Sequence, residues 1–117
     1  MPKYLVLIYG NEEIWAAEAP EWHAANAERH QALIASAGKA ILGVNELEPT
    51  TRAVSIRAGS SGKPLVTDGP FIETKEIVGG YYLLDAPDLA EAIRLASQIP
   101  EATGTHGGVE IRPIATA

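Results

Sequence analysis

The chain has 117 residues, of which 46% are apolar and 21% charged, and it contains no cysteine. This length predicts one domain over residues 1–117, and the lack of cysteine excludes disulfides, thiolate nucleophiles and zinc–cysteine sites. The net charge is −6 and the cationic residues are scattered along the chain, which argues against a nucleic-acid or anionic-membrane partner.

Hydrophobic periodicity and turn residues divide the chain into alternating strands and helices. The opening apolar run at residues 3–9 is too short for a signal sequence or a membrane span, so we expect a cytoplasmic protein. In chain order we expect a strand at 3–9, a loop or short turn at 11–19, a helix at about 20–36 and strands at 40–47 and 52–57. These are followed by a short edge strand at 64–67, a strand at 77–84, a helix that Pro87 opens and Pro100 ends, and a strand at 108–114.

This order, β-α-β-β-hairpin-β-α-β, is typical of a ferredoxin-like α+β fold, with two helices on one face of an antiparallel sheet. The other face of such a sheet is expected to be polar. The strands at 3–9 and 77–84 instead carry large apolar side chains at both alternating sets of positions. We therefore expect each strand to be buried on both faces, in a homodimer that packs through its sheet faces.

The most specific motif is the stretch Thr67–Glu76, TDGPFIETKE, followed by Gly79-Gly80-Tyr81-Tyr82. Together with the opening YLVLIYG and the closing VEIRPI, it resembles the YCII-related domain family, DGPF type. The resemblance implies a dimeric α+β barrel, in which two ferredoxin-like units pair their sheets. It also implies a link to extracytoplasmic-function sigma factors, near whose genes many members are encoded, and an enzyme that uses a His–Asp pair.

His30 is the first candidate catalytic residue. The predicted helix places it on the side that also carries Leu33 and Ile34 and faces the core. The pair Arg29-His30 resembles the placement of the histidine proposed to be catalytic in YCII-related proteins. An imidazole desolvated beside a carboxylate serves as a general acid or base. The alternative is a buried histidine that is bonded to a backbone carbonyl.

Asp68 is the second candidate catalytic residue, and it has two interpretations. Its carboxylate could orient the His30 imidazole and stabilise its charge. Aspartate before Gly69-Pro70 is also a common turn former that bonds its own backbone. The two roles are compatible, because a rigid turn holds a carboxylate in place.

The remaining candidates are binding residues. Glu73 and Lys75 fall on one side of an extended segment, where they either contact a polar substrate or solvate an edge strand. The family motif, which keeps an acid–lysine–acid cluster there, supports the first role. Tyr9 and Tyr81, together with Tyr82, either line a cavity between sheet and helices or pack in the core.

Neither a metal nor a cofactor is indicated. His23 and His30 are seven residues apart, which is too far for adjacent ligands on one helix, and His106 lies in a glycine-rich loop. The chain contains no dinucleotide or phosphate-binding glycine motif and no serine nucleophile elbow.

The favoured function is thus a cofactor-independent enzyme that moves protons on a small organic substrate, in an isomerisation or elimination. His30 would be its acid/base and Asp68 the partner of His30. The alternative is a ligand-binding or regulatory module associated with extracytoplasmic-function sigma factors. A third possibility is a scaffold dimer without a pocket.

Overall fold

The computed structural model describes residues 2–116 of the chain. Within this range its elements are β1 Lys3–Gly10, α1 Glu12–Ala17, α2 Pro20–Ala37, η1 Gly38–Ala40, β2 Ile41–Glu46, η2 Thr50–Arg52, β3 Val54–Ala58, β4 Pro64–Asp68, β5 Ile77–Asp85, α3 Leu89–Ala96, η3 Pro100–Thr103 and β6 Gly108–Pro113, where η marks a short 3-10 helix. None of the helices in this range is both long and apolar enough to cross a bilayer.

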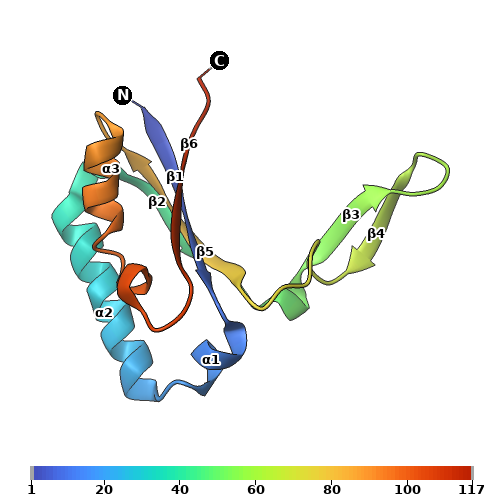
Figure 1. The fold of residues 1–117 in the computed structure, drawn as a ribbon, viewed down its shortest axis with the longest axis horizontal. Helices are drawn as coiled ribbons and strands as arrows, with labels where there is room; N and C mark the ends of the chain where they lie inside the picture. Colours follow the sequence, from blue (N-terminus) through green and yellow to red (C-terminus); the bar gives the residue numbers. More distant parts are fainter. Residues whose placement is uncertain (1, 117) are drawn as a thin grey trace.

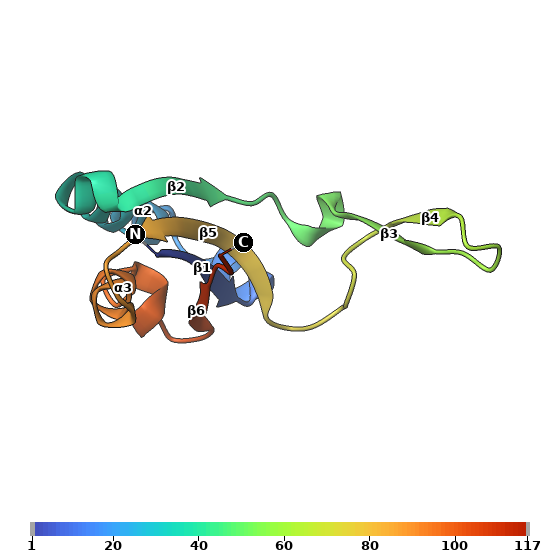
Figure 2. The ribbon, with the colours of Figure 1, turned by 90° about the horizontal axis from the view of Figure 1, so that it is seen from above.

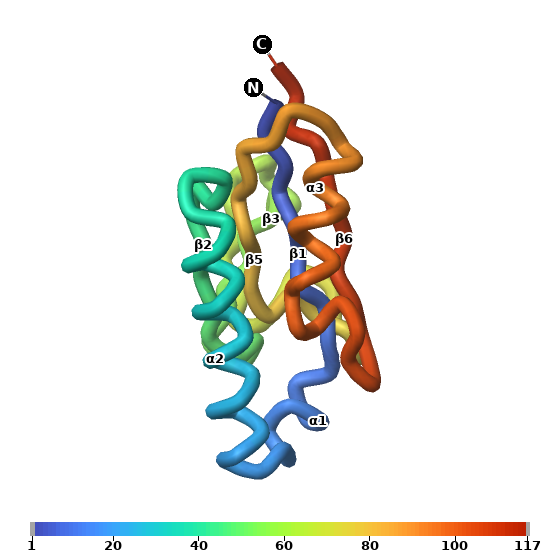
Figure 3. Tube along the Cα trace, turned by 90° about the vertical axis from the view of Figure 1, so that its left-hand side faces the viewer, coloured from blue at the N-terminus to red at the C-terminus, as the bar shows by residue number. Residues whose placement is uncertain are grey.

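The ferredoxin-like α+β arrangement expected from the sequence is confirmed. Strands β2, β5, β1 and β6 form, in this order, a four-stranded antiparallel sheet. Helices α2 and α3 both cover the same face of this sheet (Figure 3). Across residues 2–116 the sheet remains open, with β2 and β6 at its edges, so one chain does not close a barrel by itself.

The core lies between the sheet and the two helices. Alternate residues of β1 and β5 point to the helices and are at most 7% exposed. Small side chains of α3 and one leucine of α2 pack against them. The buried apolar residues are Tyr4, Val6, Ile8, Leu33, Tyr82, Leu84, Ala86, Ala92, Leu95, Ala96 and Ile99.

The opposite side of the sheet, called the open face below, is apolar as well. Leu5, Leu7 and Tyr9 alternate with the buried residues of β1, and Tyr81 and Leu83 do the same in β5. These side chains are only half-buried. The predicted two-sided apolar character of the strands is therefore confirmed, whereas the single chain buries only one side.

Strands β3 and β4 form a separate two-stranded sheet, called the arm below, which projects away from the rest of the chain (Figures 1 and 2). Its apolar residues Val54, Ile56, Leu65 and Val66 are between 54% and 61% exposed. A two-stranded hairpin alone is marginally stable in water, because it buries little apolar surface. The arm thus carries apolar surface that residues 2–116 leave uncovered.

The segment 11–19, expected to be a loop or short turn, contains the short helix α1. The Asn11 side chain caps this helix by accepting two backbone N–H groups of its first turn. Trp15 of α1 then lies over the sheet, where Gly10 and Gly79 make room for its ring. A Cβ atom on Gly79 would lie 2.7 Å from the indole, so the lack of a side chain at Gly79 lets the ring approach the strand closely.

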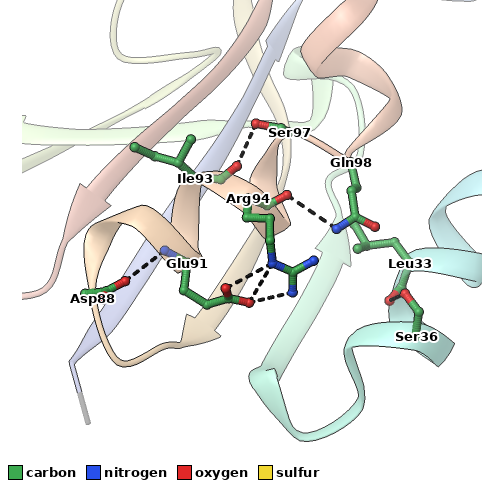
Figure 4. A network of polar contacts seen from close by, with 8 residues as sticks. All are labelled: Leu33, Ser36, Asp88, Glu91, Ile93, Arg94, Ser97 and Gln98. Atoms are coloured by element: carbon green, nitrogen blue, oxygen red, sulfur yellow. Dashed lines mark hydrogen bonds and ion pairs between the residues drawn. The ribbon is translucent and has the colours of Figure 1, made fainter.

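Helix α3 ends earlier than its proline pattern indicated. The Asp88 side chain caps its start by accepting the backbone N–H of Glu91 at 2.9 Å (Figure 4). At its other end, the Ser97 hydroxyl donates to the Ile93 carbonyl at 2.6 Å. The helix ends at Ala96, and Pro100 begins η3 rather than terminating α3.

Candidate functional site

A pocket of about 470 Å³ lies between the sheet and α2. Its size suits a small organic molecule, because ligand pockets commonly measure about 300–1,000 Å³. Two tryptophans, two histidines and two glutamates contribute to its wall. The lining residues are Ile8, Trp15, Trp22, His23, Asn26, Ala27, His30, Gln31, Ile34, Val44, Asn45, Glu46, Gly79, Gly80, Tyr82 and Glu101.

Helix α2 directs two polar side chains at one carboxylate. Asn26 and His30 are four residues apart, so they lie on the same face of the helix. Nδ2 of Asn26 donates to Oε2 of Glu101 at 2.8 Å, and Nε2 of His30 lies 2.8 Å from Oε1. Side chains of one helix thus bind both carboxylate oxygens of Glu101.

The η3 turn holds Glu101 in position. Ile99 and Pro100, which precede it, are both buried and anchor the turn against the sheet. The Glu101 side chain itself is 10% exposed and that of His30 is 20% exposed. The pair is therefore largely shielded from solvent but still borders the pocket.

The other ring nitrogen of His30 faces Tyr82 of β5. Nδ1 lies 2.6 Å from the Tyr82 hydroxyl, and the two rings stack with an interplanar angle of 18°. Tyr82 is fully buried, in contrast to its neighbour Tyr81 on the open face. Glu101, His30 and Tyr82 thus form one hydrogen-bonded row along the pocket wall.

The environment sets the protonation of both ends of this row. Burial raises the pKa of the Glu101 carboxyl, but the hydrogen bonds from His30 and Asn26 outweigh it and leave the pKa below its ordinary value. Burial of the Tyr82 phenol, reinforced by the charge of Glu101, raises its pKa to about 12. At neutral pH Glu101 is therefore ionised and Tyr82 is protonated.

The tautomer of His30 follows from these partners. Within residues 2–116, the buried Oε1 of Glu101 has no hydrogen-bond donor other than His30, so the proton belongs on Nε2. Neutral His30 then accepts the Tyr82 hydroxyl hydrogen at Nδ1. A second proton on the ring would produce an imidazolium that Glu101 stabilises directly, which makes His30 competent to accept or release a proton.

The structure places the two sequence-predicted catalytic residues apart within one chain. His30 lines the pocket, and its bonds to Glu101 and Tyr82 replace the backbone carbonyl considered as the alternative. Asp68 is the last residue of β4, on the exposed arm. Among the side-chain hydrogen bonds within residues 2–116, none involves Asp68, so the carboxylate beside His30 is Glu101.

The four predicted binding residues also lie outside this pocket. Glu73 and Lys75 are exposed in the segment between the arm and β5, and Glu73 borders a second, more open hollow near the base of the arm. Tyr9 and Tyr81 lie on the open face, where the Tyr81 hydroxyl accepts a hydrogen bond from Nδ2 of Asn45 at 2.9 Å. Of the three tyrosines considered, only Tyr82 borders the pocket.

Sequence reasoning missed Glu101 and both tryptophans. Glu101 follows Pro100, which was interpreted only as the end of a helix. A proline followed by an acid is also the pattern of a new helical turn, and that signal was present. Trp15 lies in α1, within the segment expected to be a loop or short turn. Within residues 2–116 no group of three or more acidic or histidine side chains is placed to hold a metal ion.

Two comparisons extend over nearly the whole of this fold. The model of the YCII-related domain family matches residues 2–116. The chain is also similar to an uncharacterised protein of Rhizobium meliloti (strain 1021). The two are 40% identical over 116 residues, which cover 96% of this chain and 91% of that protein. The matched range includes α2 with His30, β5 with Tyr82 and the turn with Glu101.

Proposed function

The chain belongs to the YCII-related domain family, and we propose that it is a cofactor-independent enzyme that transfers protons on a small organic molecule. The observation that carries this proposal is the row Glu101–His30–Tyr82 on the wall of a pocket of about 470 Å³. His30 is the general acid/base, and Glu101 takes the role of the partner carboxylate.

Tyr82 borders the pocket and occupies Nδ1 of His30. Because both ring nitrogens already have partners, a proton enters or leaves the row through the Tyr82 oxygen or after a ligand displaces that hydroxyl from Nδ1. In the first route, the Tyr82 oxygen takes the ligand's proton while its own proton passes to Nδ1. The imidazolium that results is stabilised by Glu101, and reversal returns a proton to the ligand.

Such a row supports isomerisation or elimination, in which a C–H bond next to a carbonyl group is broken and a proton is delivered elsewhere. The apolar walls of the pocket reduce the water around the reacting atoms and strengthen the electrostatic effect of Glu101. Each step is a proton transfer, so the chemistry needs no oxidant or external group.

Hydrogen–deuterium exchange tests the proposed activity directly. The protein is incubated in D₂O with a panel of small ketones and aldehydes, and the loss of the proton signal next to the carbonyl is followed by NMR. The native chain should accelerate exchange for at least one compound, and His30→Gln should abolish the acceleration. Arg29→Gln, at an exposed neighbouring position on α2, is the matched control and should exchange at the native rate.

Exchange that survives His30→Gln would contradict the acid/base role. A native chain that binds panel compounds but accelerates the exchange of none would instead indicate a ligand-binding module.

We further propose that two chains associate through their open faces. Leu5, Leu7 and Leu83 present half-buried apolar surface there, with Leu5 paired to Leu83 across neighbouring strands. A group of partly exposed apolar side chains on one sheet face is typical of an interface between proteins. The same face in a second copy is a suitable cover, because a two-fold axis pairs a surface with itself.

A further inference from the structure

The pocket has a charge pattern that the acid/base row does not explain, and from it we propose that its ligand is a small organic cation with a flat apolar part. The inference depends on the proposed function only in taking this pocket as the small-molecule site. It does not require that the bound molecule reacts. Catalysis and ligand class can therefore fail independently.

The pocket wall contains carboxylates and no cationic side chain of lysine or arginine. Glu46 and Glu101 contribute negative charge, whereas all nine lysines and arginines of the chain lie elsewhere in the described range. A phosphate, sulfonate or carboxylate ligand would face these two acids without a lysine or arginine to balance its charge, at a cost that increases as water is excluded. The electrostatics therefore favour a cation over an anion.

Glu46 is positioned to take the cationic group. In β2 it alternates with Asn45 and shares the helix-facing side with Val44, which pairs with Tyr82. Its partner across the strands is Gly80, which has no side chain, and Glu46 itself is exposed. Within residues 2–116 the Glu46 carboxylate takes part in no hydrogen bond or ion pair, in contrast to Glu101.

The two tryptophans supply the flat apolar contact. Trp15 is held over Gly10 and Gly79 by close packing, and Trp22 stands at the start of α2 with its ring edge-on to His23. The electron-rich face of an indole attracts a cation, and it also stacks on a planar ligand. Trp22 is 36% exposed in the single chain, which leaves part of its ring free for a ligand.

The pocket wall thus combines three elements: the row Glu101–His30–Tyr82, which handles protons, Glu46, which holds a positive group, and the two indoles. A ligand that satisfies all three is an arylalkylamine or a comparable primary ammonium compound of small size.

Intrinsic fluorescence is a direct probe, because the chain has two tryptophans and both line the pocket. Three probes of nearly equal shape are titrated at neutral pH: benzylammonium, benzyl alcohol and benzoate. We expect saturable quenching by benzylammonium, binding of benzyl alcohol that is about tenfold weaker, and no saturable change with benzoate.

The variant Glu46→Gln keeps the shape of the side chain and removes its charge. It should weaken benzylammonium about three- to fivefold and leave benzyl alcohol unchanged, because only the ion pair is lost. Glu48→Gln is the matched control, since Glu48 is an exposed acid nearby that does not line the pocket. Unchanged far-UV circular dichroism and melting temperature show that both variants are folded.

Binding of benzoate as tight as that of benzylammonium would overturn the proposal, as would affinity for benzylammonium that is independent of Glu46. Failure of all three probes to bind would overturn it as well. His30→Gln separates the two proposals: it should retain benzylammonium binding within about twofold while it loses proton transfer.

Discussion

His30 and Glu101 meet between two elements that are distant in the sequence, with Nε2 of the imidazole 2.8 Å from Oε1 of the carboxylate. The contact joins α2 to the η3 turn, and Asn26 on the same face of α2 secures the second oxygen. It gives the molecule a proton-accepting group with a fixed tautomer, next to a pocket.

The charge state of Glu101 links the stability of the fold to acidic pH. Its pKa is lowered below the ordinary value of 4.5 in the folded chain. The stability that ionised Glu101 contributes to the folded chain is therefore fully present above pH 4.5. It is lost as the pH falls through the lower pKa that Glu101 has in the folded state. We expect the free energy of unfolding, measured with denaturant, to fall on acidification in this window, and to fall less in Glu101→Gln.

Glu48→Gln serves as the control for removing a carboxylate, and its acid profile should match that of the native chain. An equal acid loss in Glu101→Gln and in the native chain would show that Glu101 is not the group responsible.

Tyr82 links the stability of the fold to alkaline pH, whereas Glu101 links it to acidic pH. Its pKa is raised from 10.0 to about 12, so the unfolded chain loses the phenol proton first. The associated stability is complete below pH 10 and is lost as the pH rises to 12. Over that range it should decline by about 1.4 kcal/mol per pH unit, as measured by denaturant unfolding.

Tyr82→Phe should lack this component of the alkaline slope, although it loses the hydrogen bond to His30 at every pH. Tyr9→Phe, on the open face, controls for the removal of a tyrosine and should retain the slope. A Tyr82→Phe profile parallel to the native one between pH 10 and 12 would contradict the assignment.

Gly79 tests how Trp15 is positioned. An alanine Cβ there would lie 2.7 Å from the indole, so Gly79→Ala must displace the ring. We expect a loss of about 1–3 kcal/mol in unfolding free energy and a red-shifted tryptophan emission. Gly43→Ala is the control, because its added Cβ would meet only the Leu83 Cβ at 4.0 Å. Native emission in Gly79→Ala would show that the wall tolerates the methyl group.

The open face predicts the oligomeric state. Sedimentation should give a dimer for the native chain, and Leu83→Arg should yield monomers, because a charge at the centre of an apolar interface is buried without a partner. Leu89→Arg on α3 is the control, at a position that is already 47% exposed and on the helical side. A monomeric native chain at tens of micromolar would refute association through this face.

The sequence by itself determined the order of elements and, in the candidate site, the position of His30. Continuous apolar runs and proline–glycine signals indicated the strands of the sheet and α2, since these are local consequences of backbone geometry. Helical spacing also placed His30 on the inner face of its helix. The sequence did not indicate the short helix α1 around Trp15 or the η3 turn that begins at Pro100. Such short helices contain too few residues to show a helical repeat of apolar side chains.

Only the tertiary structure decided which carboxylate accompanies His30. Asp68 was the natural candidate, since it lies in the most specific motif, yet it belongs to an arm that projects from the sheet. Glu101 is brought to His30 by the packing of Ile99 and Pro100 against the core. The hydrophobic effect has no preferred direction, so a sequence pattern indicates which residues are buried. It does not indicate which distant polar side chains their burial brings together.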